Sequence, residues 1–128
     1  MSNLERTRAY LRAFETRDGS NLDYYATDVV QRELPNLLVK AGATRDLAAL
    51  RRGMEAGKAS VAEERYEVVS MIEQGETVAV EAIWSAKLNI GFGTLSPGDT
   101  MRAYLAMFIT WRDGLIVSQR NYDCFEPF

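Results

Sequence analysis

The sequence predicts an α+β fold, with helices in its first half and a sheet in its second half. Three observations support this prediction. Apolar residues recur every three or four positions before residue 60, they alternate with polar residues after it, and turns that contain glycine separate the alternating segments. At 128 residues the chain has the length of one domain, so we expect residues 1–128 to share a single hydrophobic core.

Residues 3–17 predict an amphipathic helix, because apolar side chains recur at helical spacing while arginine and glutamate side chains occupy the other face. Asp18-Gly19 is a turn pair, so we expect the helix to end there. A second, short helix is expected next, with Ser20 or Asn21 as its N-cap. The apolar positions of the two helices are Leu4, Leu11, Phe14, Leu22, Tyr24 and Tyr25.

Residues 28–34 predict a short strand, because a pair of valines favours extended backbone and Pro35 cannot continue a strand ladder. A third helix is predicted from Thr44 to Met54, where leucines recur at helical spacing and Thr44 can act as the N-cap. Gly57 is expected to terminate this helix.

Four strands are predicted after residue 60, because the period of the apolar residues changes to two. Gln74-Gly75 and Asp113-Gly114 are short turns, so each joins two strands into a hairpin, and residues 89–99 form a longer connection between the hairpins. The four predicted strands are residues 61–73, 76–88, 100–112 and 115–125.

Both faces of the predicted strand at residues 100–112 carry apolar side chains. One face carries Met101, Ala103, Leu105, Met107, Ile109 and Trp111, and the other carries Tyr104, Ala106 and Phe108. Helices can cover only one face of the sheet, so we expect the other face to contact a second subunit, most simply an identical one in a homodimer. A long twisted sheet in a small domain would give the same pattern in a monomer.

Composition excludes several classes of partner. The net charge is -3, and no run of basic residues is longer than Arg51-Arg52, so we expect neither a nucleic acid nor an anionic membrane surface as partner. The N-terminus lacks the apolar stretch of a signal peptide, and no segment is long enough to span a bilayer. With a single cysteine, Cys124, the chain cannot form an internal disulfide, and we expect it to be cytoplasmic.

The sequence contains no histidine, which restricts the chemistry that it can perform. Zinc sites of the usual kind need histidine or several cysteines, and nucleophilic pairs with serine or cysteine need histidine as the base. We therefore expect no metal and no cofactor. Proton transfer near neutral pH would have to use Asp, Glu, Tyr or Lys side chains whose pKa values are shifted by their surroundings.

The strand at residues 115–125 carries three consecutive polar side chains on one face. Strand alternation places Val117, Gln119, Asn121, Asp123 and Phe125 on that face, opposite Ile116. If the face points toward the helices, its polar groups must line a cavity or bond one another, because an unpaired buried polar group costs about 1 to 3 kcal/mol. If it points to solvent, these groups need no special explanation.

The order and spacing of these elements resemble the nuclear transport factor 2-like superfamily, especially its SnoaL-like polyketide cyclase and ketosteroid isomerase branches. The resemblance covers almost the whole chain. It rests on four segments, which are AYLRAFETRD in the first helix, ATDVV at the first strand, WRDGLIV at the last hairpin and RNYD near the end. It implies a cone-shaped, curled antiparallel sheet with about three N-terminal helices on its concave face. It does not fix the reaction, because folds of this kind have many functions.

The resemblance also implies roles for individual residues. Tyr10 falls where the isomerases have an oxyanion-stabilising tyrosine, and Glu33 falls, with one residue of extra spacing, near their carboxylate base. Met107 falls where they have a protonated carboxylic acid as second donor. Methionine cannot donate a hydrogen bond, so steroid isomerisation is not expected. Asp123 falls at the acid/base aspartate of the SnoaL-like cyclases.

Together these residues predict a cofactor-independent isomerase, cyclase or related lyase that acts on a small, largely apolar carbonyl compound. Asp123, or Glu33, would remove a proton from the carbon next to the carbonyl, while Tyr10 and Asn121 or Gln119 would donate hydrogen bonds to the enolate. The further ligand contacts that we expect are Phe14, Met107 and Trp111. Two alternatives stay open. A noncatalytic binder needs only a cavity, and a dimeric interaction module tolerates a filled core.

Overall fold

The computed structural model describes residues 1–128 and contains two α-helices, one short 3-10 helix and six strands. The helical elements are α1 (Asn3–Ala13), η1 (Ser20–Tyr24) and α2 (Leu47–Ser60). The strands are β1 (Tyr25–Glu33), β2 (Ala43–Arg45), β3 (Val61–Gln74), β4 (Thr77–Leu88), β5 (Thr100–Arg112) and β6 (Leu115–Phe125). No helix is both long enough and apolar enough to span a membrane.

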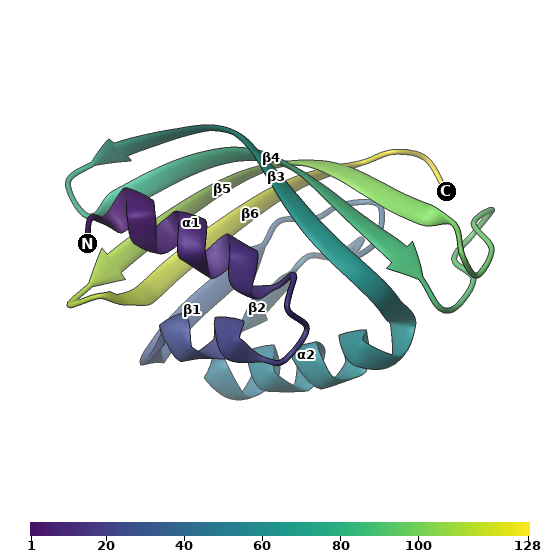
Figure 1. Ribbon diagram of the computed structural model, residues 1–128, viewed down its shortest axis with the longest axis horizontal. Helices are drawn as coiled ribbons and strands as arrows, with labels where there is room; N and C mark the ends of the chain where they lie inside the picture. Colours follow the sequence, from purple (N-terminus) through teal and green to yellow (C-terminus); the bar gives the residue numbers. More distant parts are fainter.

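The strands form one curved sheet in the order β2-β1-β6-β5-β4-β3, and the helices lie on its concave side (Figure 1). The α+β fold and the curled sheet are confirmed. Two details of the prediction differ. Only two of the three predicted helices are α-helices, because η1 is a single 3-10 segment. The sheet is mixed and not purely antiparallel, because β1 runs parallel to β6.

Helix α1 begins as its sequence predicts but ends four residues earlier. Ser2 and Glu5 form a reciprocal capping box, with distances of 3.1 Å from each backbone nitrogen to the side-chain oxygen of the other residue. The Thr16 hydroxyl donates to the carbonyl oxygen of Ala13 at 2.9 Å, a local bond that competes with continuation of the helix. Arg17 then takes a left-handed backbone conformation, with φ of 59°.

The predicted helix from Thr44 to Met54 is shifted along the chain. Thr44 lies in β2, where it pairs with Arg32, and the N-cap of α2 is Asp46, whose side chain accepts a hydrogen bond from the Ala49 nitrogen at 2.9 Å. Gly57 does not end the helix, which continues to Ser60. A glycine inside a helix costs about 1 kcal/mol relative to alanine, which is too little to terminate it.

The hydrophobic core lies between α1 and the middle of the sheet. Alternate residues of β4 and β5 point into it, as the period of two predicted. Tyr10 and Leu11 of α1 pack against this face. The largest fully buried side chains are Trp111, Tyr10, Leu11, Met107, Ile109 and Ile116.

A β-bulge in β6 changes which of its residues point inward. Trp111 pairs with Ile116 and Thr110 pairs with Ser118, so Val117 is an extra residue on β6. The prediction that Ile116 faces away from Gln119 is therefore wrong, because both side chains are buried. Beyond the bulge the predicted alternation holds, and the polar stripe of Gln119, Asn121 and Asp123 turns toward the helices.

Candidate active site

A cavity of about 360 Å³ lies between the sheet and the helices. A recess of about 180 Å³, which is lined in part by Asp123, adjoins it. The cavity and the recess share Glu33, Leu38, Glu64, Tyr66, Trp84 and Asn121. Of the 24 residues that line the cavity, 13 are hydrophobic, so an occupant with a large apolar surface is favoured. The space between sheet and helices is therefore not a filled core, which weakens the interaction-module alternative.

Asp123 is the carboxylate of the recess. It is partly buried, and its Oδ1 atom is inaccessible to solvent and has no hydrogen-bond partner in the protein. The pKa of Asp123 is raised to about 6; burial is the largest cause, the nearby Glu33 charge acts in the same direction, and Arg45 opposes both effects. The group therefore titrates close to neutral pH and keeps free lone pairs, as a general base requires.

Glu33 ends β1 beside Asp123, but its carboxylate is already engaged. Arg45 donates to Oε1 at 2.8 Å, and the Asn36 side chain donates to Oε2 at 2.8 Å. Arg45 also donates to the Gln31 side chain at 3.1 Å, which fixes the guanidinium between the two residues. With both oxygens paired, Glu33 is a poorer candidate than Asp123 for accepting a substrate proton.

Tyr10 is fully buried and belongs to a hydrogen-bonded chain across the core. Its hydroxyl donates to Gln119 Oε1 at 2.8 Å, and it lies 2.6 Å from the Tyr25 hydroxyl. Since a phenol has one proton, Tyr25 must be the donor to Tyr10. Burial raises the pKa of Tyr10 well above its usual value, and Tyr25 is the second cause. Tyr10 therefore stays protonated and keeps donating its hydrogen bond to Gln119.

The chain of hydrogen bonds continues from the core to the cavity. Gln119 Nε2 donates to Asn121 Oδ1 at 2.9 Å and contacts the Met107 sulfur at 3.7 Å. The side-chain nitrogen of Asn121 (Nδ2) makes no hydrogen bond to the protein, and the residue lines both the cavity and the recess. Asn121 therefore presents a free donor next to Asp123, whereas the donor of Tyr10 is occupied.

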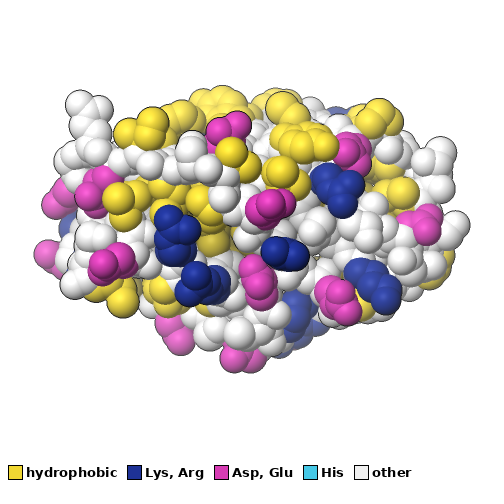
Figure 2. Space-filling view, turned by 45° about the horizontal axis from the view of Figure 1, so that its top comes forward, with side chains coloured by type: hydrophobic (Ala, Val, Ile, Leu, Met, Phe, Trp, Pro, Cys, Tyr) yellow, Lys and Arg dark blue, Asp and Glu magenta, His cyan; other side chains and the backbone are white.

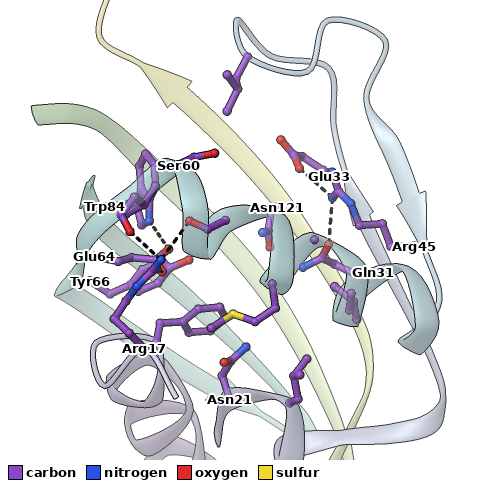
Figure 3. Close-up of a pocket in the computed structure, with 18 of the residues that line it drawn as sticks. Arg17, Asn21, Gln31, Glu33, Arg45, Ser60, Glu64, Tyr66, Trp84 and Asn121 are labelled. Atoms are coloured by element: carbon purple, nitrogen blue, oxygen red, sulfur yellow. Dashed lines mark hydrogen bonds and ion pairs between the residues drawn. The ribbon is translucent and has the colours of Figure 1, made fainter. Parts of the chain in front are cut away.

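A second polar cluster forms the opposite wall of the cavity (Figure 3). Glu64 Oε2 accepts from Trp84 Nε1 at 2.8 Å, and Glu64 Oε1 accepts from Arg17 at 2.9 Å. Arg17 also donates to the carbonyl oxygens of Gly57 and Val61, so it joins the end of α2 to the start of β3. Burial raises the pKa of Glu64, and the bonds from Trp84 and Arg17 oppose this shift.

The structure brings most of the predicted site residues together. Tyr10, Phe14, Glu33, Gln119 and Asn121 line the cavity, and Asp123 lines the recess. Met107 and Trp111 line neither. Both are buried in the core, where the Trp111 indole nitrogen donates to the Thr7 hydroxyl at 3.0 Å.

Sequence reasoning missed the cluster on β3. Glu64 and Tyr66 lie two positions apart on one strand, so they share a face, and this spacing was the available signal. It also missed Arg17 and Arg45, because nothing in the sequence pairs them with their carboxylates. No group of three or more Cys, Asp or Glu side chains lies close enough together to bind a metal ion.

The comparisons with known proteins agree with this fold. A model of the SnoaL-like domain matches residues 7–119 of the sequence. IdmH from Streptomyces antibioticus, a candidate polyketide cyclase, superposes with a TM-score of 0.79 at 19% identity, covering 96% of this chain and 92% of that chain. TerC, co-crystallised with polyporic acid, superposes with a TM-score of 0.74 at 23% identity, covering 97% of this chain and 91% of that chain.

A hypothetical protein with a ketosteroid isomerase-like fold from Catenulispora acidiphila, in complex with trimethylamine, gives a TM-score of 0.73 at 16% identity, covering 92% of this chain and 84% of that chain. No curated protein matches the sequence. At these identities, likeness to solved structures establishes the fold and leaves the reaction open. The family model, in contrast, spans most of the sequence, from α1 to β6. The chain therefore belongs to the SnoaL-like domain family.

Proposed function

We propose that this protein is an acid/base enzyme of the isomerase or cyclase type, acting on a small, largely apolar carbonyl compound with Asp123 as its base. The observation that carries this proposal is the Asp123 carboxylate, which accepts no hydrogen bond from the protein and lines a recess beside an apolar cavity. Burial of the carboxylate raises its pKa to about 6, so it is mostly ionised at neutral pH but can be protonated readily.

The proposed reaction begins when an Asp123 oxygen takes a proton from the carbon next to the carbonyl group. The electron pair of the broken C–H bond forms the C=C bond of an enolate, and the negative charge moves to the oxygen. The free amide donor of Asn121 stabilises that charge. In an isomerisation, Asp123 returns the proton to another carbon. In a cyclisation, the enolate carbon bonds to a second carbonyl carbon, whose oxygen takes the proton from Asp123.

Two relatives support this class of substrate. IdmH is a candidate polyketide cyclase, and TerC was co-crystallised with polyporic acid. An aromatic or polycyclic carbonyl compound would suit the lining of the present cavity, where Phe14, Tyr66 and Trp84 offer rings and the polar groups lie at opposite sides.

The test uses 2-tetralone, a bicyclic ketone whose protons next to the carbonyl exchange with solvent. The wild type should accelerate their exchange in D₂O, followed by NMR, and Asp123→Asn should reduce the rate about 100-fold or more. Asp28→Asn, a change at a solvent-exposed surface pair, is the matched control. The enolate analogue 2-naphthol should still bind to Asp123→Asn. Binding without any exchange in the wild type would contradict catalysis and favour a noncatalytic binder.

We further propose that the face of the sheet away from the helices binds a second copy of the chain. Tyr104 is 47% exposed and Tyr122 is 44% exposed on that face. Phe108 packs edge-on against Tyr122 at 5.9 Å, and the Arg120 guanidinium lies 5.3 Å from the Phe108 ring centre. Figure 2 is turned to bring the top of Figure 1 forward, and apolar side chains gather along the upper part of the molecule in that view.

Sedimentation equilibrium tests this assembly. The wild type should have twice the mass of one chain, and Tyr122→Glu should dissociate it by placing a charge in the apolar contact. A monomeric wild type at micromolar concentration would refute the proposal.

A further inference from the structure

We propose that Tyr66 donates a hydrogen bond to the carbonyl oxygen of the substrate, the role that the family resemblance implies for Tyr10. This inference deepens the proposed function and rests on it. It follows from which hydroxyl groups of the cavity are already used by the protein. A phenol has a single proton, so a tyrosine can stabilise an enolate only if that proton is not bonded elsewhere.

Tyr66 lies on β3 and lines both the cavity and the recess that holds Asp123. Its hydroxyl makes no hydrogen bond to the protein, whereas the hydroxyls of Tyr10 and Tyr25 bond each other and Tyr10 also bonds Gln119. The Tyr66 hydroxyl keeps access to solvent, and the residue lines both spaces, so a ligand there can reach it. A ligand in the cavity can therefore accept a hydrogen bond from this hydroxyl without breaking any hydrogen bond within the protein.

The ring of Tyr66 is held in place from two directions. Phe14 of the α1 C-cap contacts it edge-on, with ring centres 5.2 Å apart. On β4 its cross-strand partner is Trp84, whose indole nitrogen is fixed by Glu64. In Figure 3 Tyr66, Glu64 and Trp84 lie on one side, Glu33 and Arg45 lie on the other, and Asn121 lies between. A fixed donor loses little conformational entropy when a ligand binds.

The surroundings of Tyr66 also keep its hydroxyl protonated. Burial raises the pKa of Tyr66 well above its usual value, and the negative charges of Glu64, Asp123 and Glu33 act in the same direction. The hydroxyl is therefore a neutral donor throughout the pH range in which Asp123 changes its charge. Base and donor can then act in the same reaction step.

The recess thus offers one base and two free donors. Asp123 would face the carbon that loses its proton, while the Tyr66 hydroxyl and the Asn121 amide would both face the oxygen. An oxygen with two lone pairs can accept both bonds. This arrangement selects a substrate whose carbonyl group enters the recess and whose apolar rings stay in the larger cavity. Bicyclic or larger aromatic ketones have that shape.

The experiment compares three Tyr→Phe variants in two assays. Titration with 2-naphthol measures binding of an enolate analogue, and D₂O exchange of 2-tetralone measures proton removal. Tyr66→Phe should weaken naphthol binding about 10-fold and slow exchange about 100-fold, as for the loss of one oxyanion donor. Tyr24→Phe is the matched control, because the Tyr24 ring packs against Tyr10 but does not line the cavity. It should change both values less than 2-fold. Tyr10→Phe should weaken naphthol binding less than Tyr66→Phe does.

An NMR readout separates ligand contact from a structural role. In protein labelled with ¹³C at the Cζ atom of tyrosine, the resonance that is missing in Tyr66→Phe should shift when 2-naphthol binds. Unchanged naphthol affinity in Tyr66→Phe, or a larger loss in Tyr10→Phe, would overturn the assignment. Failure of 2-naphthol to bind the wild type would overturn it as well.

The outcomes also separate this inference from the proposed function. Exchange that depends on Asp123 but not on Tyr66 would refute the role of Tyr66 and leave the enzyme assignment standing. Naphthol binding that depends on Tyr66, in a protein that exchanges no protons, would support Tyr66 as a ligand donor and refute catalysis.

Discussion

Asp123 should make the protein less stable at neutral pH than an uncharged side chain would. Its pKa rises from 3.8 in the unfolded chain to about 6 in the folded protein, which is a shift of about 2 units. At 1.36 kcal/mol per unit the ionised carboxylate lowers the free energy of unfolding by about 3 kcal/mol at most. Asp123 is partly exposed, so solvent screening reduces the expected effect to about 1–2 kcal/mol.

The pH dependence follows from the sign of this shift. A carboxyl group with a raised folded pKa contributes its full stability below pH 3.8 and loses it as the pH rises through 6. Asp123→Asn removes the ionisation but keeps the shape. The variant should match the wild type near pH 4 and exceed its stability by about 1–2 kcal/mol at pH 7.5, or about 3–6 °C in Tm.

Urea unfolding of both proteins at pH 4 and pH 7.5 measures this difference. Asp28→Asn is the control with opposite sign, because the hydrogen bond from Arg112 lowers the pKa of Asp28. That change should not stabilise the protein at pH 7.5. If Asp123→Asn gave the same difference at both pH values, or destabilised the protein at pH 7.5, the account of a desolvated carboxylate would be refuted.

Three further predictions concern neighbouring residues. Glu33→Gln removes a negative charge beside Asp123, so the midpoint of the pH profile for 2-tetralone exchange should move below the wild-type value, as NMR rates between pH 4 and 8 would reveal. Tyr10→Phe leaves Gln119 Oε1 buried without its donor and should cost about 1–3 kcal/mol in urea unfolding, without abolishing exchange. Arg17→Met breaks a mostly buried ion pair and should lower the free energy of unfolding by about 2–4 kcal/mol. The control, Arg102→Met at an exposed pair, should lower it by less than about 1 kcal/mol. Equal losses in urea unfolding would contradict the burial argument.

The sheet could be predicted from the sequence because strand alternation is a local property. The strands at 100–112 and 115–125 have the predicted bounds, and their turns carry the expected glycines. The boundaries of α2 could not be predicted in the same way. Thr44 and Asp46 are both good N-caps, and the choice between them depends on the pairing of β2 with β1, which is a tertiary contact.

The site was predicted only in part, for a related reason. Strand alternation placed Asp123 on one face with Gln119 and Asn121 but left open whether that face points toward the helices. The occupied hydroxyl of Tyr10 depends on Tyr25 and Gln119, which are distant in sequence, and so does the free hydroxyl of Tyr66. Sequence patterns locate polar groups on faces. Which of them keep a free proton is decided only when distant segments meet.

The bulge at Val117 divides β6 into two stretches with different packing. The stretch on the hairpin side holds Ile116 in the interior, and the stretch beyond it holds Gln119, Asn121 and Asp123, whose roles we propose. Because the extra residue absorbs the change of phase between them, Ile116 and the residues from Gln119 onward can face the same side of the sheet. The polar groups that face the cavity could thus be exchanged for another set while Ile116 keeps its place in the core.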